Sequence, residues 1–284
     1  MRRHDRIRPR PTANRSTPRT LPSSVGRVST PLVVGHRGAA AVAPENTLAS
    51  FRAAFDAGAR WVETDVHLSA EGVPFLLHDD SLARTTDAAD AGVDAEADVE
   101  SLPWSQIRRV DAGARWGAAF AGERVPHLDE LGALLQATGG SLDLEVKAPS
   151  RPAAEVVAAL GETLSSQVWH DVVAQGRLVV TSFDPFVVAE SLEVLAPMGV
   201  PIGLLVEDVP DADDLAELAA SGVAVLATNH VTLTEEGALA VGRAGLRLWV
   251  YTANRPEDWA RLTRLGVEAV CTDDPAAMLA FLRA

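Results

Sequence analysis

The sequence predicts a single (β/α)8 barrel, and three observations lead to that fold class. At 284 residues the chain is long enough for such a barrel, which typically has about 250 residues. Apolar strands alternate with amphipathic helices about every 22 to 25 residues through the second half of the chain. Eight strands are then expected to be parallel. They are 32–35, 61–66, 142–147, 177–182, 202–206, 223–227, 246–251 and 269–272.

The first 30 residues differ from the rest in composition. They hold eight arginines and one acid, Asp5, without apolar periodicity, so residues 1–30 are predicted to be a disordered basic tail. Residues 31–284, the predicted barrel, carry a net charge of -21, which disfavours nucleic acid and anionic membranes as partners. No apolar run approaches the roughly 20 residues of a membrane span, and no apolar stretch of an export signal follows Arg2 and Arg3. We therefore expect a cytoplasmic protein without stable membrane insertion, of unknown oligomeric state.

The first strand, 32–35, is followed at once by His36, Arg37 and Gly38. A titratable imidazole, a permanent cation and a residue that lets another group approach closely could form an anion site. Taken alone, the three residues are more typical of a capping histidine and a surface arginine. A helix follows, with Asn46 or Thr47 as its N-cap, apolar residues at 48, 51 and 55, and Gly58 as its end.

The second strand places Glu63 and Asp65 on one face, because side chains alternate between faces along a strand. Two carboxylates there repel each other unless a cation lies between them, although a solvated edge strand would also carry such residues. A short turn at 69–72 makes the return over 73–78 antiparallel. This hairpin brings His78 back toward the two carboxylates.

Residues 80–125 are too many for an ordinary connection, and such segments are usually functional or form a small subdomain. A helix over 126–138 then leads to a strand with Asp143, Glu145 and Lys147 on one face. This strand could be an ordinary half-exposed edge. However, Lys147 is the only lysine in a chain with 24 arginines, so a compact ammonium group is predicted to be needed at that position.

Helices at 186–195, 211–221, 234–244, 256–265 and 275–283 complete the alternation. The C-terminal ends of barrel strands face the active site, so side chains at these ends are the candidates for it. The carboxylates Glu63, Asp65 and Glu145 suit Mg²⁺ or Ca²⁺ better than zinc. Together with a metal, the two histidines, the arginine and the lysine would form a site for phosphoryl oxygens with an acid and a base. The candidates are His36, Arg37, Glu63, Asp65, His78, Glu145, Lys147, Ser182, Trp249 and Tyr251.

Seven motifs in this order resemble those of the glycerophosphodiester phosphodiesterase family, over about residues 31–284. They are His-Arg-Gly at 36–38, Pro-Glu-Asn-Thr at 44–47, Glu-Thr-Asp-Val at 63–66, His-Asp at 78–79, Val-Pro-x-Leu-x-Glu at 125–130, Leu-Glu-Val-Lys at 144–147 and Thr-Asp-x-Pro at 272–275. The motifs are highly specific in combination. The resemblance implies a TIM barrel with an inserted subdomain and one divalent cation, Mg²⁺ or Ca²⁺. It also implies hydrolysis of glycerophosphodiesters to sn-glycerol 3-phosphate and an alcohol.

The resemblance also implies roles for individual residues. Glu63, Asp65 and Glu145 would be the metal ligands. His36 and His78 would be the acid/base pair, and Arg37 and Lys147 the phosphate contacts. Trp249 and Phe183 would form a substrate-binding wall, although both could instead be ordinary packing at the barrel rim.

Two other functions stay open at this point. A phospholipase D-like enzyme acting on lysophospholipids or sphingomyelin would share the metal site but would need an apolar rim for membrane docking, against which the acidic body argues. A non-catalytic barrel that binds phosphate esters would leave both histidines without a role.

Overall fold

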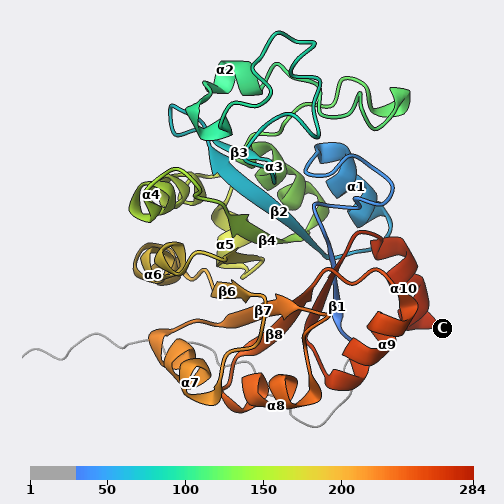
Figure 1. Cartoon of the computed structure of the whole chain (residues 1–284), viewed down its shortest axis with the longest axis vertical. Helices are drawn as coiled ribbons and strands as arrows, with labels where there is room; N and C mark the ends of the chain where they lie inside the picture. Colours follow the sequence, from blue (N-terminus) through green and yellow to red (C-terminus); the bar gives the residue numbers. More distant parts are fainter. Residues whose placement is uncertain (1–29) are drawn as a thin grey trace, which may run out of the picture.

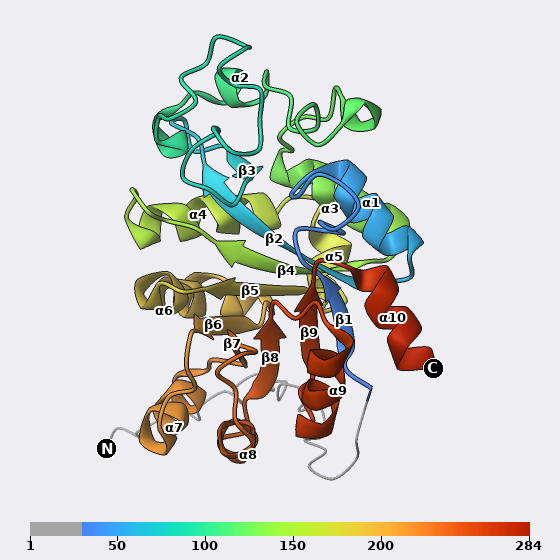
Figure 2. The ribbon, with the colours of Figure 1, turned by 45° about the vertical axis from the view of Figure 1, so that its right-hand side comes forward.

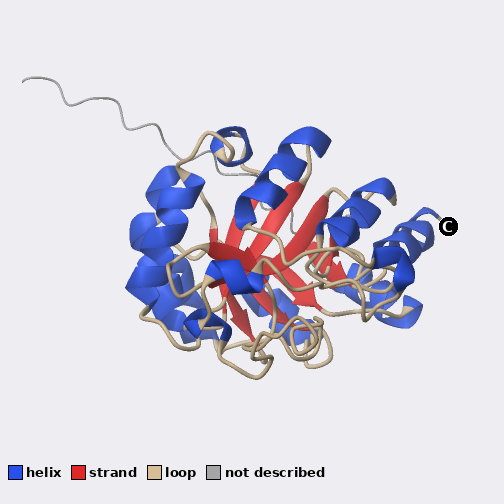
Figure 3. Cartoon of the chain, turned by 90° about the horizontal axis from the view of Figure 1, so that it is seen from above, coloured by secondary structure: helices blue, strands red, loops and turns tan. Residues whose placement is uncertain are grey.

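The computed structural model describes residues 30–284, so the predicted tail lies outside the described residues except for Thr30. Eight parallel strands close into a barrel with helices around it (Figure 3), which confirms the predicted fold class. The parallel strands are β1 (Leu32–Gly35), β2 (Trp61–Leu68), β4 (Ser141–Val146), β5 (Leu178–Ser182), β6 (Ile202–Val206), β7 (Val225–Asn229), β8 (Arg247–Tyr251) and β9 (Ala269–Thr272).

The barrel closes where β1 pairs with both β2 and β9. Gly35 lies opposite Val62 on one side and Thr272 on the other. The short strand β3 (Pro74–Leu76) is antiparallel to β2, so the return strand is a hairpin partner and not a barrel strand, as predicted. Its pairing of Pro74 with Leu68 also explains why β2 extends two residues beyond the predicted end at 66.

The helices cover the outside of the barrel (Figures 1 and 2). Two of them, α4 and α5, lie in residues 148–176, for which no element was predicted. The helices outside the hairpin insertion are α1 (Leu48–Asp56), α3 (Leu128–Thr138), α4 (Ala153–Leu164), α5 (His170–Ala174), α6 (Pro185–Val194), the 3-10 turn η3 (Ala196–Met198), α7 (Ala212–Ser221), α8 (Glu235–Arg243), α9 (Pro256–Leu265) and α10 (Pro275–Arg283).

Alternation along each strand divides the core into two layers. On β4, Leu142, Leu144 and Val146 point outward and join the large cluster between strands and helices. Inside the barrel, a smaller cluster contains Val34 of β1 and Trp249 of β8. Because side chains repeat every two residues, those at the C-terminal ends of the inner faces converge above this small cluster.

The turn from β1 into α1 is tightly built. Gly38 has φ +93°, and a Cβ there would lie 2.4 Å from the Oγ of Ser50, so no larger residue fits. Arg37 (φ 50°) and Asn46 (φ 55°) also adopt the left-handed conformation, which is unusual for residues other than glycine and is often found at functional sites. Thr47 is the N-cap of α1, accepting a hydrogen bond from the backbone N–H of Ser50.

The segment after the hairpin projects beyond one end of the barrel, beside β2 and β3 (Figure 1). It contains only short helices, and its hydrophobic cluster, which includes Leu82, Val99, Ile107 and Val110, is separate from the barrel core. The short helices are η1 (Val99–Ser101), α2 (Trp104–Ile107) and η2 (Ala118–Phe120). Within residues 30–284, no helix combines the length and apolar character needed to cross a membrane.

Candidate active site

A cavity of about 320 Å³ opens at the C-terminal ends of the barrel strands. One side of the cavity is polar and is formed by residues that lie in or just after β1 to β4. The other side is mainly apolar and is formed by residues that lie in or just after β5 to β9. The polar side contains His36, Arg37, Glu63, His78, Asp143, Glu145 and Lys147, and the apolar side includes Phe183, Leu205, Ala227, Trp249, Tyr251 and Cys271.

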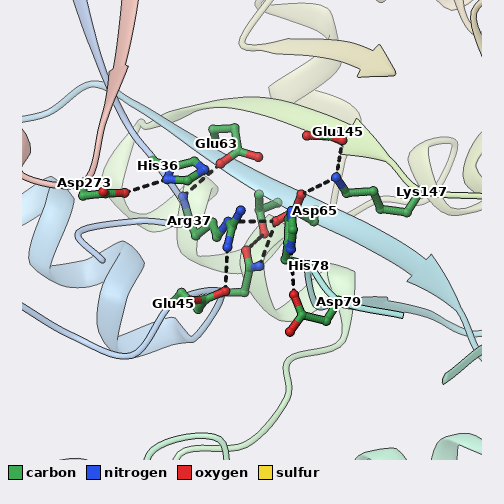
Figure 4. A network of polar contacts seen from close by, with 12 residues as sticks. His36, Arg37, Glu45, Glu63, Asp65, His78, Asp79, Glu145, Lys147 and Asp273 are labelled. Carbon is green, nitrogen blue, oxygen red and sulfur yellow. Dashed lines mark hydrogen bonds and ion pairs between the residues drawn. The ribbon is translucent and has the colours of Figure 1, made fainter. Parts of the chain in front are cut away.

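Three carboxylates meet at the base of the polar side (Figure 4). Glu63 and Asp65 come from β2, and Glu145 from the adjacent β4, where it is paired directly with Asp65. One oxygen of each carboxylate lies within 4.8 Å of an oxygen of the other two. The three predicted metal ligands are therefore brought together by strand alternation and by the register of a single strand pair.

The charges of these carboxylates are not balanced within the protein. Burial and the neighbouring Asp65 and Glu145 raise the pKa of Glu63 well above its usual range. Burial and Asp65 likewise raise the pKa of Glu145 to about 7, although Lys147 acts in the opposite direction. Asp65 differs: burial raises its pKa, but Lys147 and Arg37 outweigh burial and lower it.

The carboxylate cluster fits a hard divalent cation. Within the described residues, the buried Oδ1 atom of Asp65 accepts no hydrogen bond, and its nearby cation is the ammonium group of Lys147 at 3.2 Å. Carboxylate oxygens are the ligands that Mg²⁺ and Ca²⁺ prefer, and a cation among them would offset the repulsion that raises the pKa values of Glu63 and Glu145. The cluster could therefore hold one such ion.

Two permanent cations border this cluster. The Nε atom of Arg37 lies 3.4 Å from Asp65 Oδ2, and its Nη1 atom donates to Glu45 Oε1 at 2.8 Å. The ammonium group of Lys147 lies 3.2 Å from Asp65 Oδ1 and donates to Glu145 Oε1. Both side chains line the cavity, as a contact to a phosphate group requires.

His36 and His78 lie at the cavity with a carboxylate behind each ring (Figure 4). The Nδ1 atom of His36 is 2.6 Å from Oδ1 of Asp273, a residue that follows β9, and the Nδ1 atom of His78 is 2.8 Å from Oδ1 of Asp79. When Nδ1 is the donor in each pair, Nε2 is left to exchange protons. Burial chiefly lowers the pKa of His78, which favours its neutral form.

The two predicted wall residues occupy different places on the apolar side. Trp249 is 3% exposed and packs against Trp61, with ring centroids 5.3 Å apart. Its buried indole N–H borders the cavity and has no hydrogen-bond partner in the part of the chain that the structure describes. Phe183 is 43% exposed at the rim, with its ring centroid 5.7 Å from that of Tyr251.

Ser182 ends β5, as predicted, but its side chain is turned away from the cavity. Its hydroxyl donates to the backbone oxygen of Val146 and accepts from the N–H of Asp184, and the residue does not line the cavity. On β5 the inner face carries Val179 and Thr181, so strand alternation turns Ser182 outward.

The sequence reasoning missed several residues that support the site. Asp143 was placed on the correct face but given no role. It accepts a hydrogen bond from Thr181 at 2.8 Å, and burial, partly offset by that bond, raises its pKa to about 7. Asp273 and Glu45 lie in quoted motifs, but nothing in the sequence linked them to His36 and Arg37. Arg84, in the insertion, gave no signal at all.

Exchange of Lys147 for arginine tests the argument from composition. We expect Lys147→Arg to lower kcat/KM at least about 10-fold, on the order of 1.4 kcal/mol, with little change in Tm. The reason is that a planar guanidinium is broader than the ammonium now beside Asp65 and Glu145. Arg177→Lys is the control, because Arg177 directly precedes β5 and so lies at the end of the barrel opposite the cavity. Full activity of both Lys147→Arg and Lys147→Ala would contradict the role given to Lys147.

The pKa values predict how pH affects the metal-free protein. The folded-state pKa values of Glu63 and Glu145 are raised, so the protonated forms of these groups stabilise the fold. This contribution is complete at a pH below the pKa of the unfolded chain. It is lost as pH rises through the folded-state pKa, which is about 7 for Glu145. In EDTA, we expect Tm to fall between about pH 5 and about pH 8. A saturating divalent cation should reduce that fall by holding the carboxylates ionised. An equal fall in Tm over this pH range with and without the cation would contradict this prediction.

The fold and the cavity together define a class of protein: a barrel hydrolase for phosphate esters, with an acidic cluster for a cation, two bordering basic groups and two carboxylate-supported histidines. Residues 36–277 match the Glycerophosphoryl diester phosphodiesterase family. The chain belongs to this family.

Individual relatives agree with this assignment. The chain is 29% identical to a glycerophosphodiester phosphodiesterase of Caldanaerobacter subterraneus, over 89% of this chain and 98% of that protein. Its fold matches a phosphodiesterase of Oleispira antarctica, solved in complex with the product sn-glycerol-3-phosphate, with a TM-score of 0.80, 29% identity and coverage of 90% and 98% of the two chains. A glycerophosphodiester phosphodiesterase of Agrobacterium tumefaciens matches with a TM-score of 0.70, 26% identity and coverage of 88% and 99%.

Proposed function

We propose that this protein hydrolyses glycerophosphodiesters to sn-glycerol 3-phosphate and an alcohol, using one divalent cation, Mg²⁺ or Ca²⁺. The observation that carries the proposal is the meeting, in one cavity, of the three-carboxylate cluster with two bordering cations and two histidines. Each histidine is held by its own carboxylate, an arrangement that supports proton transfer and not binding alone.

A cation held by Glu63, Asp65 and Glu145 would polarise a phosphoryl oxygen and lower the pKa of the adjacent glycerol hydroxyl. The chain's own cations, Arg37 and Lys147, would bind the phosphate oxygens and offset the charge that develops on them. On the opposite side, Trp249 and Phe183 would lie against the glycerol carbons.

The surroundings of the two histidines favour different proton-transfer roles. The carboxylate of Asp79 is shared between His78 and Arg84, so its charge is largely compensated, and His78 is suited to accept a proton in its neutral form. Asp273 contacts His36 and accepts from the neutral amide of Asn254, so it is shared with a neutral group, whereas Asp79 is shared with a cation. We therefore assign His78 as the base and His36 as the acid that protonates the leaving alkoxide.

The proposed nucleophile is the 2-hydroxyl of the glycerol moiety. Its oxygen would attack phosphorus as His78 takes its proton, the alcohol would leave with a proton from His36, and water would then open the cyclic phosphate. An intramolecular hydroxyl benefits from a high effective concentration. Turnover of an analogue without this hydroxyl at a similar rate would show that water attacks directly.

Glycerophosphocholine and a lysophospholipid, assayed side by side with and without EDTA, test the proposal. We expect sn-glycerol 3-phosphate to form from glycerophosphocholine, EDTA to stop its formation, and Mg²⁺ or Ca²⁺ added in excess of EDTA to restore it. Preferred hydrolysis of the lysophospholipid would favour the phospholipase D-like alternative. Binding of the phosphate ester without turnover would favour the non-catalytic barrel. The cytoplasmic location stays a prediction, which cell fractionation would test.

A further inference from the structure

The insertion supplies one side chain, Arg84, that joins two parts of the active site. Its Nε and Nη2 atoms donate to the two carboxylate oxygens of Asp79, at 2.5 and 2.9 Å. Its Nη1 and Nη2 atoms donate to the two oxygens of Glu45, both at 2.7 Å. Four N–H groups of one guanidinium thus bind two carboxylates, each through two hydrogen bonds. Arg84 itself does not line the cavity.

Each of these carboxylates holds a residue of the proposed machinery. Asp79 accepts from the Nδ1 atom of His78 at 2.8 Å, and Glu45 accepts from Nη1 of Arg37 at 2.8 Å. The two carboxylates belong to different parts of the fold, because Asp79 follows β3 and Glu45 precedes α1. Without Arg84, each carboxylate would keep its partner in the site but lose the group that fixes its own position.

An arginine is suited to this position for geometric reasons. Its planar fork can bind two carboxylates at once with paired hydrogen bonds, whereas an ammonium group offers a single point of charge. The link also compensates charge. Partial burial raises the pKa of Asp79, but hydrogen bonds from Arg84 and His78 more than offset this and lower it to about 2. The hydrogen bonds that Arg84 donates to Glu45 and Asp79 raise the pKa of Arg84.

We infer that Arg84 is a positioning residue for phosphodiester hydrolysis, which acts through Asp79 on His78 and through Glu45 on Arg37. The insertion is then part of the active site, because it sets the geometry of one proton-transfer group and one phosphate contact from outside the cavity. This inference rests on the proposed function.

The test measures kcat, KM and Tm for Arg84→Ala and Arg84→Lys with glycerophosphocholine. We expect kcat/KM to fall about 100-fold in Arg84→Ala, as small misplacements of reacting groups can do. Arg84→Lys should recover little of the loss, because an ammonium group cannot make paired hydrogen bonds to both carboxylates at once. Arg109→Ala removes another arginine of the insertion, one that donates to the backbone oxygen of Ala91, and should keep normal activity.

Coupling between residues separates positioning from general stability. In an Asp79→Asn/Glu45→Gln background, the further change Arg84→Ala should alter kcat/KM by less than about 3-fold, because both carboxylates through which Arg84 acts are already changed. When only Asp79→Asn is present, adding Arg84→Ala should act mainly on KM. When only Glu45→Gln is present, adding it should act mainly on kcat. Methylguanidinium should partly restore Arg84→Ala but not His78→Ala. If Arg84→Ala does not fold, Arg84→Gln replaces it.

Two outcomes would overturn the inference. One is a normal kcat/KM in every Arg84 variant while His78→Ala is inactive, which would leave the proposed function intact. The other is a loss of about 100-fold in Arg84→Ala that persists in the double-variant background, which would show that Arg84 acts by another route. Absence of hydrolysis by the unmodified protein would instead contradict the proposed function.

Discussion

Replacement of any one carboxylate of the proposed metal site should remove almost all activity. We expect Glu63→Gln, Asp65→Asn and Glu145→Gln each to lower kcat/KM by more than about 100-fold, because even residues behind metal ligands often cost 10- to 100-fold when changed. The three oxygens lie within 4.8 Å of one another, so loss of one leaves too few anionic ligands for a hard cation. Calorimetric titration with Mg²⁺ and Ca²⁺ should show weaker binding in each variant.

The comparison variant for this experiment is Asp143→Asn. Asp143 lies opposite Glu63 in the strand pair and is also buried, but it accepts a hydrogen bond from Thr181 and lies outside the cluster. Its metal affinity should stay close to that of the unmodified protein. Unchanged affinity in all three cluster variants would remove the metal from this position.

Stability should follow a different pattern from activity. Glu63 and Glu145 have raised pKa values, so removing either charge relieves repulsion, and the metal-free Tm should not fall. Asp65 pairs with both Arg37 and Lys147, and its removal leaves two partly buried cations without a shared carboxylate. We therefore expect Asp65→Asn to lower Tm as well as activity, which thermal unfolding in EDTA would measure.

The second large effect concerns the histidines. His36→Ala and His78→Ala should each lower kcat/KM by about 100-fold or more, the usual range for acid/base groups. A glycerophosphodiester with a nitrophenol leaving group distinguishes their roles. Nitrophenolate leaves without a proton, so this substrate should recover much of the rate of His36→Ala but not that of His78→Ala.

His170→Ala is the matched control, because His170 is exposed and also lies beside an aspartate, Asp171. Its activity should be normal with both substrates. The opposite recovery, in His78→Ala alone, would exchange the two proton-transfer roles. No loss in either variant would exclude acid/base catalysis by this pair.

The parts of this structure that depend on local pattern could be read from the sequence. Alternation alone placed Glu63 with Asp65 and Glu145 with Lys147 on inner faces, and the same rule could have excluded Ser182, whose neighbours Thr181 and Phe183 face the cavity. Local pattern was not sufficient everywhere, because α4 and α5 lie in residues 148–176, where no helix was predicted.

Contacts between distant segments could not be read in this way. Asp273 and His36 are 237 positions apart and meet only because the barrel closes. Arg84 meets Glu45 across 39 positions because the start of the insertion lies beside the loop between β1 and α1. Such pairs depend on tertiary geometry, which no residue spacing encodes. For the same reason, the sequence left the acid and the base unassigned, because the compensating partners of Asp79 and Asp273 were unknown.

The contact between His36 and Asp273 also bears on how the molecule becomes active. It joins the residue after the first strand to the residue after the last, beside the pairing of Gly35 with Thr272. In a partly folded chain in which β9 has not joined β1, the proposed proton donor His36 would lack the support of Asp273, even with Glu63, Asp65 and Glu145 already in place. During refolding, we therefore expect cation binding to return before turnover, with a lag that includes the time needed for β9 to pair with β1.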